Sequence, residues 1–329
     1  MSRIFGDVDL EQTLGTQNLP AMPQVAVALL NLSRDPNAGP AEYADIIELD
    51  PGLTAQVLRY VNSSYFGFRS EILSTRQAIT LVGIRAIKNF VLYSAVYNVM
   101  PNPKQGGFDL RLLWQDSLRR ALFARSISKA MGMKDAESPF AGALLQDMAV
   151  PFLVSKLPKA YEVLLETRRK EMDRQIRLSV LEEHAFGWNH GVAAGVVAKQ
   201  WELPNDFVSL VTAHTEIGKW AAQADSEPEC FSVALSALLP ACDSNKWPEY
   251  KMFEKYYEKH RPRSAPDIPE LLKSVDHQFS EFAPILRMSM PKQSLEDRYQ
   301  LEADLAGPSE EEQAAMAVDA VLSSGSHSH

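Results

Sequence analysis

The sequence predicts an all-helical (all-α) protein, and three observations support this fold class. Apolar residues recur at helical spacing, for example at Val25, Leu29 and Leu32. Helix start signals recur as well, for example Asp50 before Pro51, where the aspartate can cap free amides and the proline needs no hydrogen bond. Apolar and polar residues nowhere alternate at period two over the length of a strand. We therefore expect helices throughout the chain and no sheet.

The first hundred residues carry five expected helices. They cover residues 23–32, 40–49, 51–61, 74–82 and 84–99. Gly83 separates the last two, an arrangement that occurs both in DNA-binding helix-turn-helix proteins and at packing corners between core helices. We favour the packing corner, because the second helix offers only Arg85 and Lys88 as basic residues beside a rich apolar set.

Segment 101–107 (PNPKQGG) is the clearest internal break, and it divides the chain into lobes. We expect an N-terminal helical lobe over residues 10–103, a second helical lobe over residues 108–243, and a C-terminal extension over residues 244–329. Helices expected in the second lobe cover residues 112–131, 140–153, 160–170, 179–186, 190–201, 207–220 and 231–239.

The C-terminal extension differs in character from the two lobes. It is expected to contain a charged aromatic helix (251–260), a proline-rich strap (261–269), one or two helices within 271–290, an acidic capped helix (314–322) and a disordered tail (323–329). Lys, Tyr and Phe are interleaved in 251–260, as in a nucleic-acid groove, but a solvated helix face with half-buried aromatics is the commoner origin of this pattern.

Composition is that of an ordinary globular protein with an acidic balance. Hydrophobic residues make up 46% of the 329 residues, and the formal net charge is −9. Proteins that bind nucleic acid through their overall charge are usually basic, since phosphates must be neutralised. The acidic balance therefore counts against a nucleic-acid partner bound through overall charge, and leaves open only a local basic patch.

Cysteine content and hydropathy bear on location. Cys230 and Cys242 are too few for a disulfide framework and are expected to be inert buried thiols, which favours a reducing cytoplasmic setting. Residues 1–7 show no signal-peptide pattern. The most apolar stretches, 90–100 and 230–242, are too short for a membrane span, so we expect no membrane contact.

Several spaced segments together resemble a known family. Residues 140–148 (FAGALLQDM), with 112–118 before and 186–191 after, resemble the HD superfamily of helical phosphohydrolases. Four segments of the first lobe narrow this to the HDOD family (HD-related output domain), a degenerate branch of that superfamily: LPAMP (19–23), DPGLT (50–54), VNSSYFG (61–67) and AITLVGI (78–84). The resemblance covers about residues 10–241. It implies a two-lobed helical bundle of HD-superfamily type.

The resemblance also implies a depleted metal site. HD hydrolases hold divalent metal with imidazoles and carboxylates, and the metal activates a water against a phosphate ester. Here the first His position falls on Asp116, the His-Asp doublet on Gln146-Asp147, and the terminal Asp near Ala237. A neutral amide is a poor substitute for imidazole.

The donors that remain are Asp116, Asp147, His190 and His214, which could form a residual metal site or could simply be buried, hydrogen-bonded polar residues. The second interpretation is favoured. Gln115, Gln146 and Asn189 are further candidates to contact a ligand in the cleft.

Two functions from different classes follow, with a third behind them. The first is a non-enzymatic bacterial signal-transduction module, without catalytic residues or a cofactor, that binds a regulatory protein or a small nucleotide-like ligand. The second is a residual metal-dependent phosphohydrolase acting on phosphodiesters or nucleotides through the four remaining donors. The third is a DNA-binding regulator using residues 74–99. The sequence indicates neither the pathway nor the oligomeric state.

Overall fold

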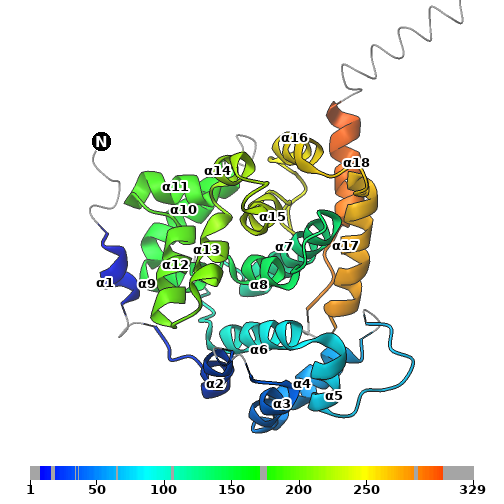
Figure 1. Ribbon diagram of the computed structural model, residues 1–329. Helices are drawn as coiled ribbons and strands as arrows, with labels where there is room; N and C mark the ends of the chain where they lie inside the picture. The colour runs from blue at the N-terminus through cyan, green and yellow to red at the C-terminus, as the bar shows by residue number, and fades with distance from the viewer. Residues whose placement is uncertain are drawn as a thin grey trace, which may run out of the picture.

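The computed structural model describes residues 8–15, 19–33, 35, 37–63, 66–104, 107–170, 176–284 and 288–306. Over these ranges the regular secondary structure is helical, and no strand occurs in them (Figure 1). The predicted fold class is therefore confirmed. The expected acidic helix (314–322) and tail (323–329) lie outside the described residues.

The N-terminal lobe forms the lower part of the molecule in Figure 1. The helices within the expected range 10–103 are α1 (Leu10–Leu14), α2 (Gln24–Leu32), α3 (Pro40–Glu48), α4 (Pro51–Val61), α5 (Thr75–Val82) and α6 (Ile84–Val99), of which α2 to α6 form this lower part. The predicted caps are present: the Asp50 side chain accepts a hydrogen bond from the Leu53 amide, and the Ser74 side chain accepts one from the Gln77 amide. The five expected helices thus begin where the sequence placed them, whereas α1 was not expected and packs on the second lobe, against α9 and α12.

The second lobe forms the larger upper part of the molecule. Its helices are α7 (Leu110–Ala130), α8 (Glu137–Leu145), α9 (Val150–Lys156), α10 (Pro158–Lys170), α11 (Leu178–Phe186), α12 (His190–Gln200), α13 (Asn205–Ala213), α14 (Ile217–Ala222) and α15 (Pro228–Ser236). Two helices expected to be continuous are broken. The break between α8 and α9 contains Asp147, and the break between α13 and α14 contains His214, so turns present both side chains.

The C-terminal extension returns along the second lobe. It contains α16 (Tyr250–His260), α17 (Ile268–Phe282) and α18 (Leu295–Ala306). Helix α17 packs along α7, and α18 packs against α17 (Figure 1). The proline-rich strap connects α16 to α17 and is fixed by a hydrogen bond from the Tyr257 hydroxyl to the Pro266 carbonyl. Helix α18 was not expected from the sequence.

Gly83 forms a packing corner rather than a DNA-reading turn. Its φ of +98° is left-handed, a conformation open to glycine, and α5 and α6 meet there at a bend of 118°. Most of α6 from Ala86 to Val96 is buried, whereas a recognition helix needs an exposed face. No single helix of the described residues is long and apolar enough to cross a membrane; only the bent pair of α5 and α6 meets those criteria, and it does so jointly.

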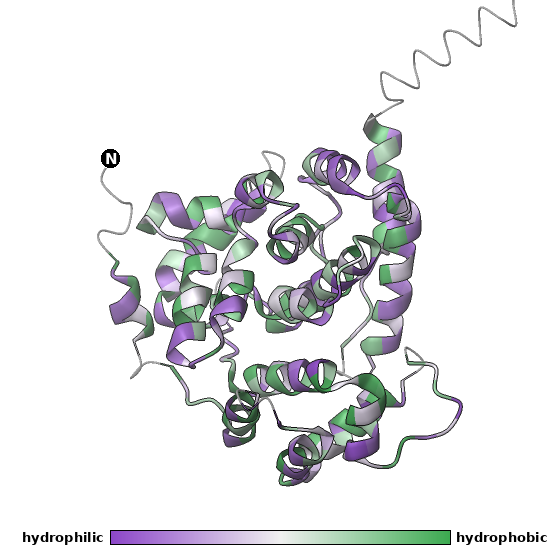
Figure 2. Cartoon of the chain, in the orientation of Figure 1, coloured by the Kyte–Doolittle hydropathy of each residue, from purple (hydrophilic) through white to green (hydrophobic). Residues whose placement is uncertain are grey.

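Close packing at the centre of the second lobe depends on one glycine of α8. Apolar positions line the inner faces of the helices (Figure 2). A Cβ added to Gly142 would lie 2.6 Å from the Leu210 Cβ of α13 and 3.3 Å from Val233 Cγ2 of α15. The absence of a side chain therefore lets α8 approach α13 and α15.

We expect Gly142→Ala to destabilise the protein by about 1–3 kcal/mol, because the core must shift to accept the methyl group. Gly218→Ala is the matched control, since a Cβ there meets no atom within 4 Å and alanine favours a helix. Urea unfolding of both variants checks this. Equal midpoints for the two variants would show that the approach of α8 is not tight.

Candidate functional site around Asp147

A cleft of about 610 Å³ opens beside α7. Its wall includes the turn between α8 and α9, the N-terminus of α12, the C-terminal end of α13 and the segment that follows α15. The charged and imidazole side chains that line it include Asp116, Arg120, Asp147, Arg177, His190 and His214. Leu112, Leu113, Val150, Leu165 and Ile176 add apolar surface. A cleft of this size and mixed lining is typical of a small-molecule site.

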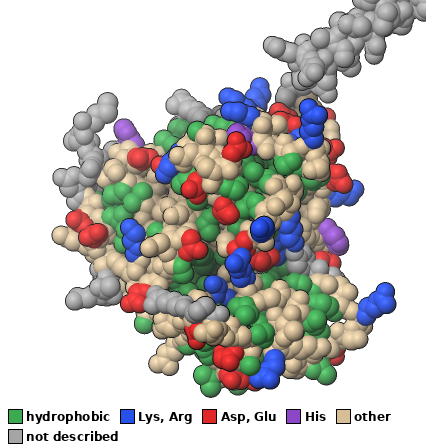
Figure 3. Space-filling model, in the orientation of Figure 1, with side chains coloured by type: hydrophobic (Ala, Val, Ile, Leu, Met, Phe, Trp, Pro, Cys, Tyr) green, Lys and Arg blue, Asp and Glu red, His purple; other side chains and the backbone are tan. Residues whose placement is uncertain are grey.

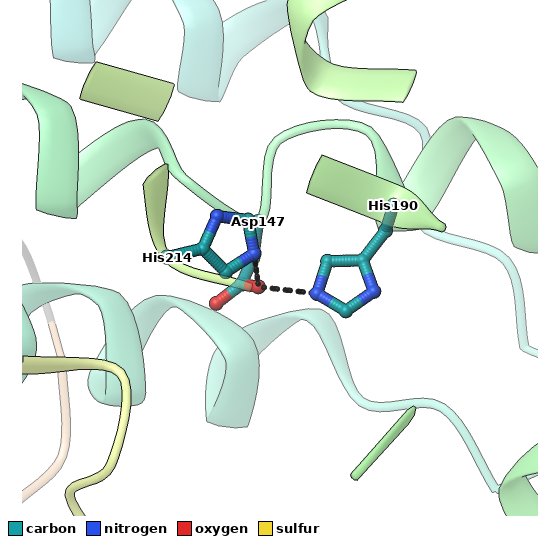
Figure 4. Close-up of side chains that lie close together, drawn as sticks. All are labelled: Asp147, His190 and His214. Carbon is teal, nitrogen blue, oxygen red and sulfur yellow. Dashed lines mark ion pairs between the residues drawn. The ribbon is translucent and has the colours of Figure 1, made fainter. Parts of the chain in front are cut away.

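Asp147 is at the centre of this group. Its Oδ1 atom lies 3.4 Å from His190 Nε2 and 3.5 Å from His214 Nε2 (Figure 4). Its Oδ2 atom forms an ion pair with Nη1 of Arg120, which comes from α7. All four residues are largely or fully buried. The structure thus brings together three of the four predicted metal donors.

His190 is held by a carboxylate that the sequence analysis missed. Glu182 of α11 is fully buried, and its Oε2 lies 2.5 Å from His190 Nδ1 and accepts the His190 backbone amide at 2.7 Å. Its Oε1 accepts the Tyr161 hydroxyl at 2.6 Å. This arrangement orients the imidazole so that Nε2 faces Asp147. A signal was present: Glu182 lies four residues from both Leu178 and Phe186, on the apolar face of α11.

His214 is oriented by the backbone. Its Nδ1 lies 2.8 Å from the Val211 carbonyl oxygen, so Nδ1 carries the proton and donates. Its buried Nε2 then faces the site as an acceptor and has no hydrogen-bond partner among the described residues. Arg177 donates to the His214 carbonyl at 3.0 Å, which fixes the turn that presents the ring.

The charges of the three site residues are set by burial and by each other. Burial alone would raise the pKa of Asp147, but Arg120 and the two histidines hold it well below its usual range. Burial alone would lower the pKa of His190, but the carboxylates of Glu182 and Asp147 raise it to about 9. Burial lowers the pKa of His214 to about 3, against the attraction of Asp147. At neutral pH His190 is therefore cationic and His214 neutral.

These two pKa shifts predict that the free energy of unfolding falls both at acidic pH, through His214, and at alkaline pH, through His190. In the unfolded chain His214 is protonated below about pH 6.5, whereas in the folded protein it is protonated only below about pH 3. The free energy of unfolding therefore falls as the pH drops below 6.5. His190 contributes stability that is complete below pH 6.5 and is lost as pH rises towards 9. For each histidine, the free energy of unfolding changes by at most about 1.4 kcal/mol per pH unit.

In urea unfolding measured at a series of pH values, we expect the free energy of unfolding of His214→Asn to fall less between pH 6.5 and pH 4 than that of the wild type. His277→Asn, which changes an exposed histidine of α17, serves as the control and should keep the wild-type profile. If His214→Asn loses stability between pH 6.5 and pH 4 as steeply as the wild type, the lowered pKa of His214 is not the cause of that loss.

Asp147, His190 and His214 form a buried cluster with the composition of a metal site. Their donor atoms lie within 4.8 Å of one another, and both imidazoles turn Nε2 inward while Nδ1 is bonded to a carboxylate or carbonyl, as metal-bound histidines are. One feature does not fit: the Arg120 guanidinium already neutralises Asp147, so a divalent ion there would meet a fixed cation.

The other predicted site residues lie differently. Asp116 lines the cleft, but its Oδ1 accepts the Cys242 amide at 2.6 Å. Gln115 donates to the carbonyl and hydroxyl of Ser289, away from the cleft. Asn189 caps α12 by accepting the Gly191 and Val192 amides.

Gln146, at the His position of the doublet, is fully buried and does not line the cleft. Neither atom of its amide has a hydrogen-bond partner among the described residues. Ala237 lines the cleft where the motif would place its last carboxylate. Both cysteines are buried, as expected, and burial raises the pKa of each thiol.

Comparison with known proteins agrees with this architecture. An uncharacterized protein of Treponema pallidum (strain Nichols) is 23% identical over 199 residues, which are 60% of this chain but 37% of that protein. The chain thus spans little more than a third of that relative's length.

Two solved structures share the fold. One, from Marinobacter aquaeolei VT8 and provisionally named a signal transduction protein, has a TM-score of 0.61 at 19% identity and covers 86% of this chain and 62% of its own. Another, from Shewanella amazonensis SB2B and provisionally named a phosphohydrolase, has a TM-score of 0.57 at 16% identity. The match covers 88% of this chain and 97% of that structure's chain.

The family profile described as the HDOD domain matches residues 19–217, more than half of the chain. That range contains α2 to α13 together with Asp147, His190 and His214. The chain belongs to the HDOD domain family.

Proposed function

We propose that this protein is a non-enzymatic module of bacterial signal transduction that acts by binding a small nucleotide-like ligand in the cleft or a regulatory protein partner. The pairing of Arg120 with Asp147 carries the proposal. A guanidinium at the central carboxylate supplies the positive charge that a hydrolase would obtain from its metal, but it activates no water.

The remaining ligand positions support the same conclusion. Gln146 offers an amide buried away from the cleft, Ala237 offers no donor, and the Asp116 carboxylate is bonded to the Cys242 amide. HD chemistry needs several imidazoles and carboxylates around its metal, whereas the cluster at Asp147 contains two imidazoles and one carboxylate with donor atoms within 4.8 Å of one another.

A residual metal-dependent phosphohydrolase is the second candidate, and the inward-facing Nε2 atoms of His190 and His214 favour it. Two imidazoles and one carboxylate can hold a single divalent ion with open positions. This function requires Arg120 to leave Asp147 when a metal binds.

Elemental analysis of protein purified without chelator, together with a phosphodiester and nucleotide turnover assay, separates the two candidates. The proposal predicts substoichiometric metal and no turnover. Stoichiometric Mn, Fe, Ni or Zn that is lost in His190→Ala, together with turnover, would establish the hydrolase instead.

No observation favours the DNA-binding alternative. Helix α6 is buried over most of its length, and the face of the molecule in Figure 3 intersperses acidic and basic side chains. A mobility shift with duplex DNA at physiological salt should therefore show no complex.

A further inference from the structure

The segment between α15 and α16 forms one wall of the cleft. Its residues Asp243, Ser244, Lys246 and Glu249 line the cavity. At the start of the segment, the Cys242 amide donates to Asp116 Oδ1 at 2.6 Å. Residues 242–249, called the cleft segment below, are therefore attached to the cleft face of α7.

The other side of the cleft segment is attached to α18. Arg298 Nη2 donates to the Ser244 carbonyl at 2.7 Å, and the Trp247 amide donates to Glu302 Oε1 at 2.9 Å. Arg298 and Trp247 are both buried, with 6% and 2% of their surface exposed, so water does not readily replace these bonds. Residues on opposite sides of the cleft segment thus contact the cleft and α18.

Helix α7 provides a second connection between the cleft and α18, because neighbouring residues of the helix face the cleft on one side and the C-terminal extension on the other. Asp116 and Arg120, four residues apart, face the cleft. Gln115 and Arg119, also four residues apart, face the extension: Gln115 donates to Ser289 and Arg119 donates to the Gln293 carbonyl at 2.9 Å. The irregular stretch 288–294, which leads into α18, is therefore bonded to the same part of α7 that carries Asp116 and Arg120.

We propose that the C-terminal extension is the output element of the cleft: a ligand that displaces the cleft segment or the Asp116 side chain alters the hydrogen bonds that hold α18. The inference rests on the proposed function in taking the cleft as the binding site. The hydrogen bonds that would carry the coupling lie within this chain, so the coupling can be tested without a ligand. The extension lies outside the family match over 19–217.

The first test perturbs the cleft and measures α18. Asp116→Ala removes the acceptor of the Cys242 amide, whereas Asp116→Asn keeps an oxygen acceptor at the same place. Hydrogen exchange followed by mass spectrometry should show amides of residues 295–306 exchanging about threefold faster or more in Asp116→Ala, and near the wild-type rate in Asp116→Asn. Far-UV circular dichroism establishes that both variants are folded.

The second test runs in the opposite direction. Glu302→Ala removes the acceptor of the Trp247 amide, whereas Glu302→Gln keeps one. Amide hydrogen exchange in residues 242–249 should become faster in Glu302→Ala and stay near the wild-type rate in Glu302→Gln. The NMR signals of the His190 and His214 imidazoles should likewise shift only in Glu302→Ala. Lys273→Gln is a further control, because it breaks an exposed α17–α18 ion pair of 3.9 Å without touching the cleft segment.

The outcomes separate this inference from the proposed function. If α18 exchanges equally in Asp116→Ala and Asp116→Asn, and the cleft signals are equal in Glu302→Ala and Glu302→Gln, the coupling is absent even where the cleft binds a ligand. Conversely, metal-dependent turnover would overturn the proposed function while leaving a measured coupling intact. Equal changes in Lys273→Gln and Glu302→Ala would also overturn the coupling, since they would reflect general loosening of α18.

Discussion

Replacing Arg120 with alanine should destabilise the protein by about 3 kcal/mol, because the buried Asp147 carboxylate would lose its guanidinium partner and keep only the His190 imidazolium, 3.4 Å away, as a counter-charge. Asp116 lies on the same face of α7 and is also attracted to Arg120, so the loss extends to a second, partly buried carboxylate. The measurement is the free energy of unfolding in urea at pH 7.

Two variants make this result specific. In the double variant Arg120→Ala/Asp147→Asn the carboxylate charge that Arg120 balanced is gone, so part of the lost stability should return. Arg111→Ala breaks an exposed pair with Asp109, the N-cap residue of the same helix, and should leave stability near that of the wild type. If the two replacements at 120 and 147 prove additive, Arg120 does not neutralise Asp147.

Replacing Glu182 with alanine should cost about 3 kcal/mol or more, because three hydrogen bonds to one buried carboxylate would be lost together. The Tyr161 hydroxyl and the His190 amide would become buried donors without acceptors. The pKa of His190, raised to about 9 against the effect of burial, should fall towards or below its ordinary value of 6.5.

NMR titration of His190 and urea unfolding measure the two effects. Glu183→Ala removes the neighbouring, exposed carboxylate and provides the control. A His190 pKa near 9 in Glu182→Ala would mean that Asp147 alone holds the proton, and that Glu182 does not orient the ring.

Much of the fold was predictable because its signals are local. Caps such as Asp50 and Ser74, and the turn at Gly83, depend on neighbouring residues, and the structure confirms them. The breaks at Asp147 and His214 were missed because tertiary bonds fix those turns: Asp147 pairs with Arg120 from α7, and Arg177 holds the His214 carbonyl. No helical period predicts contacts between segments so far apart.

The candidate site was predictable in part for the same reason. Asp147, His190 and His214 were selected through the family motif, and the structure brings them together. Arg120 and Glu182 were missed because each acts through a partner distant in sequence. Gln115 was proposed for the cleft, but its position on α7 turns it towards the extension, a contact 174 residues away along the chain.

The most direct test of the central claim compares divalent-metal binding by the wild type and Arg120→Ala, using calorimetric titration with Mn²⁺ and Zn²⁺ at pH 7. If the Arg120 guanidinium takes the place of the metal charge at Asp147, the wild type should bind weakly and Arg120→Ala at least about tenfold more tightly, because the competing cation is gone. That gain should vanish in Arg120→Ala/His190→Ala. Tight, stoichiometric binding by the wild type that is unchanged or weaker in Arg120→Ala would contradict the claim.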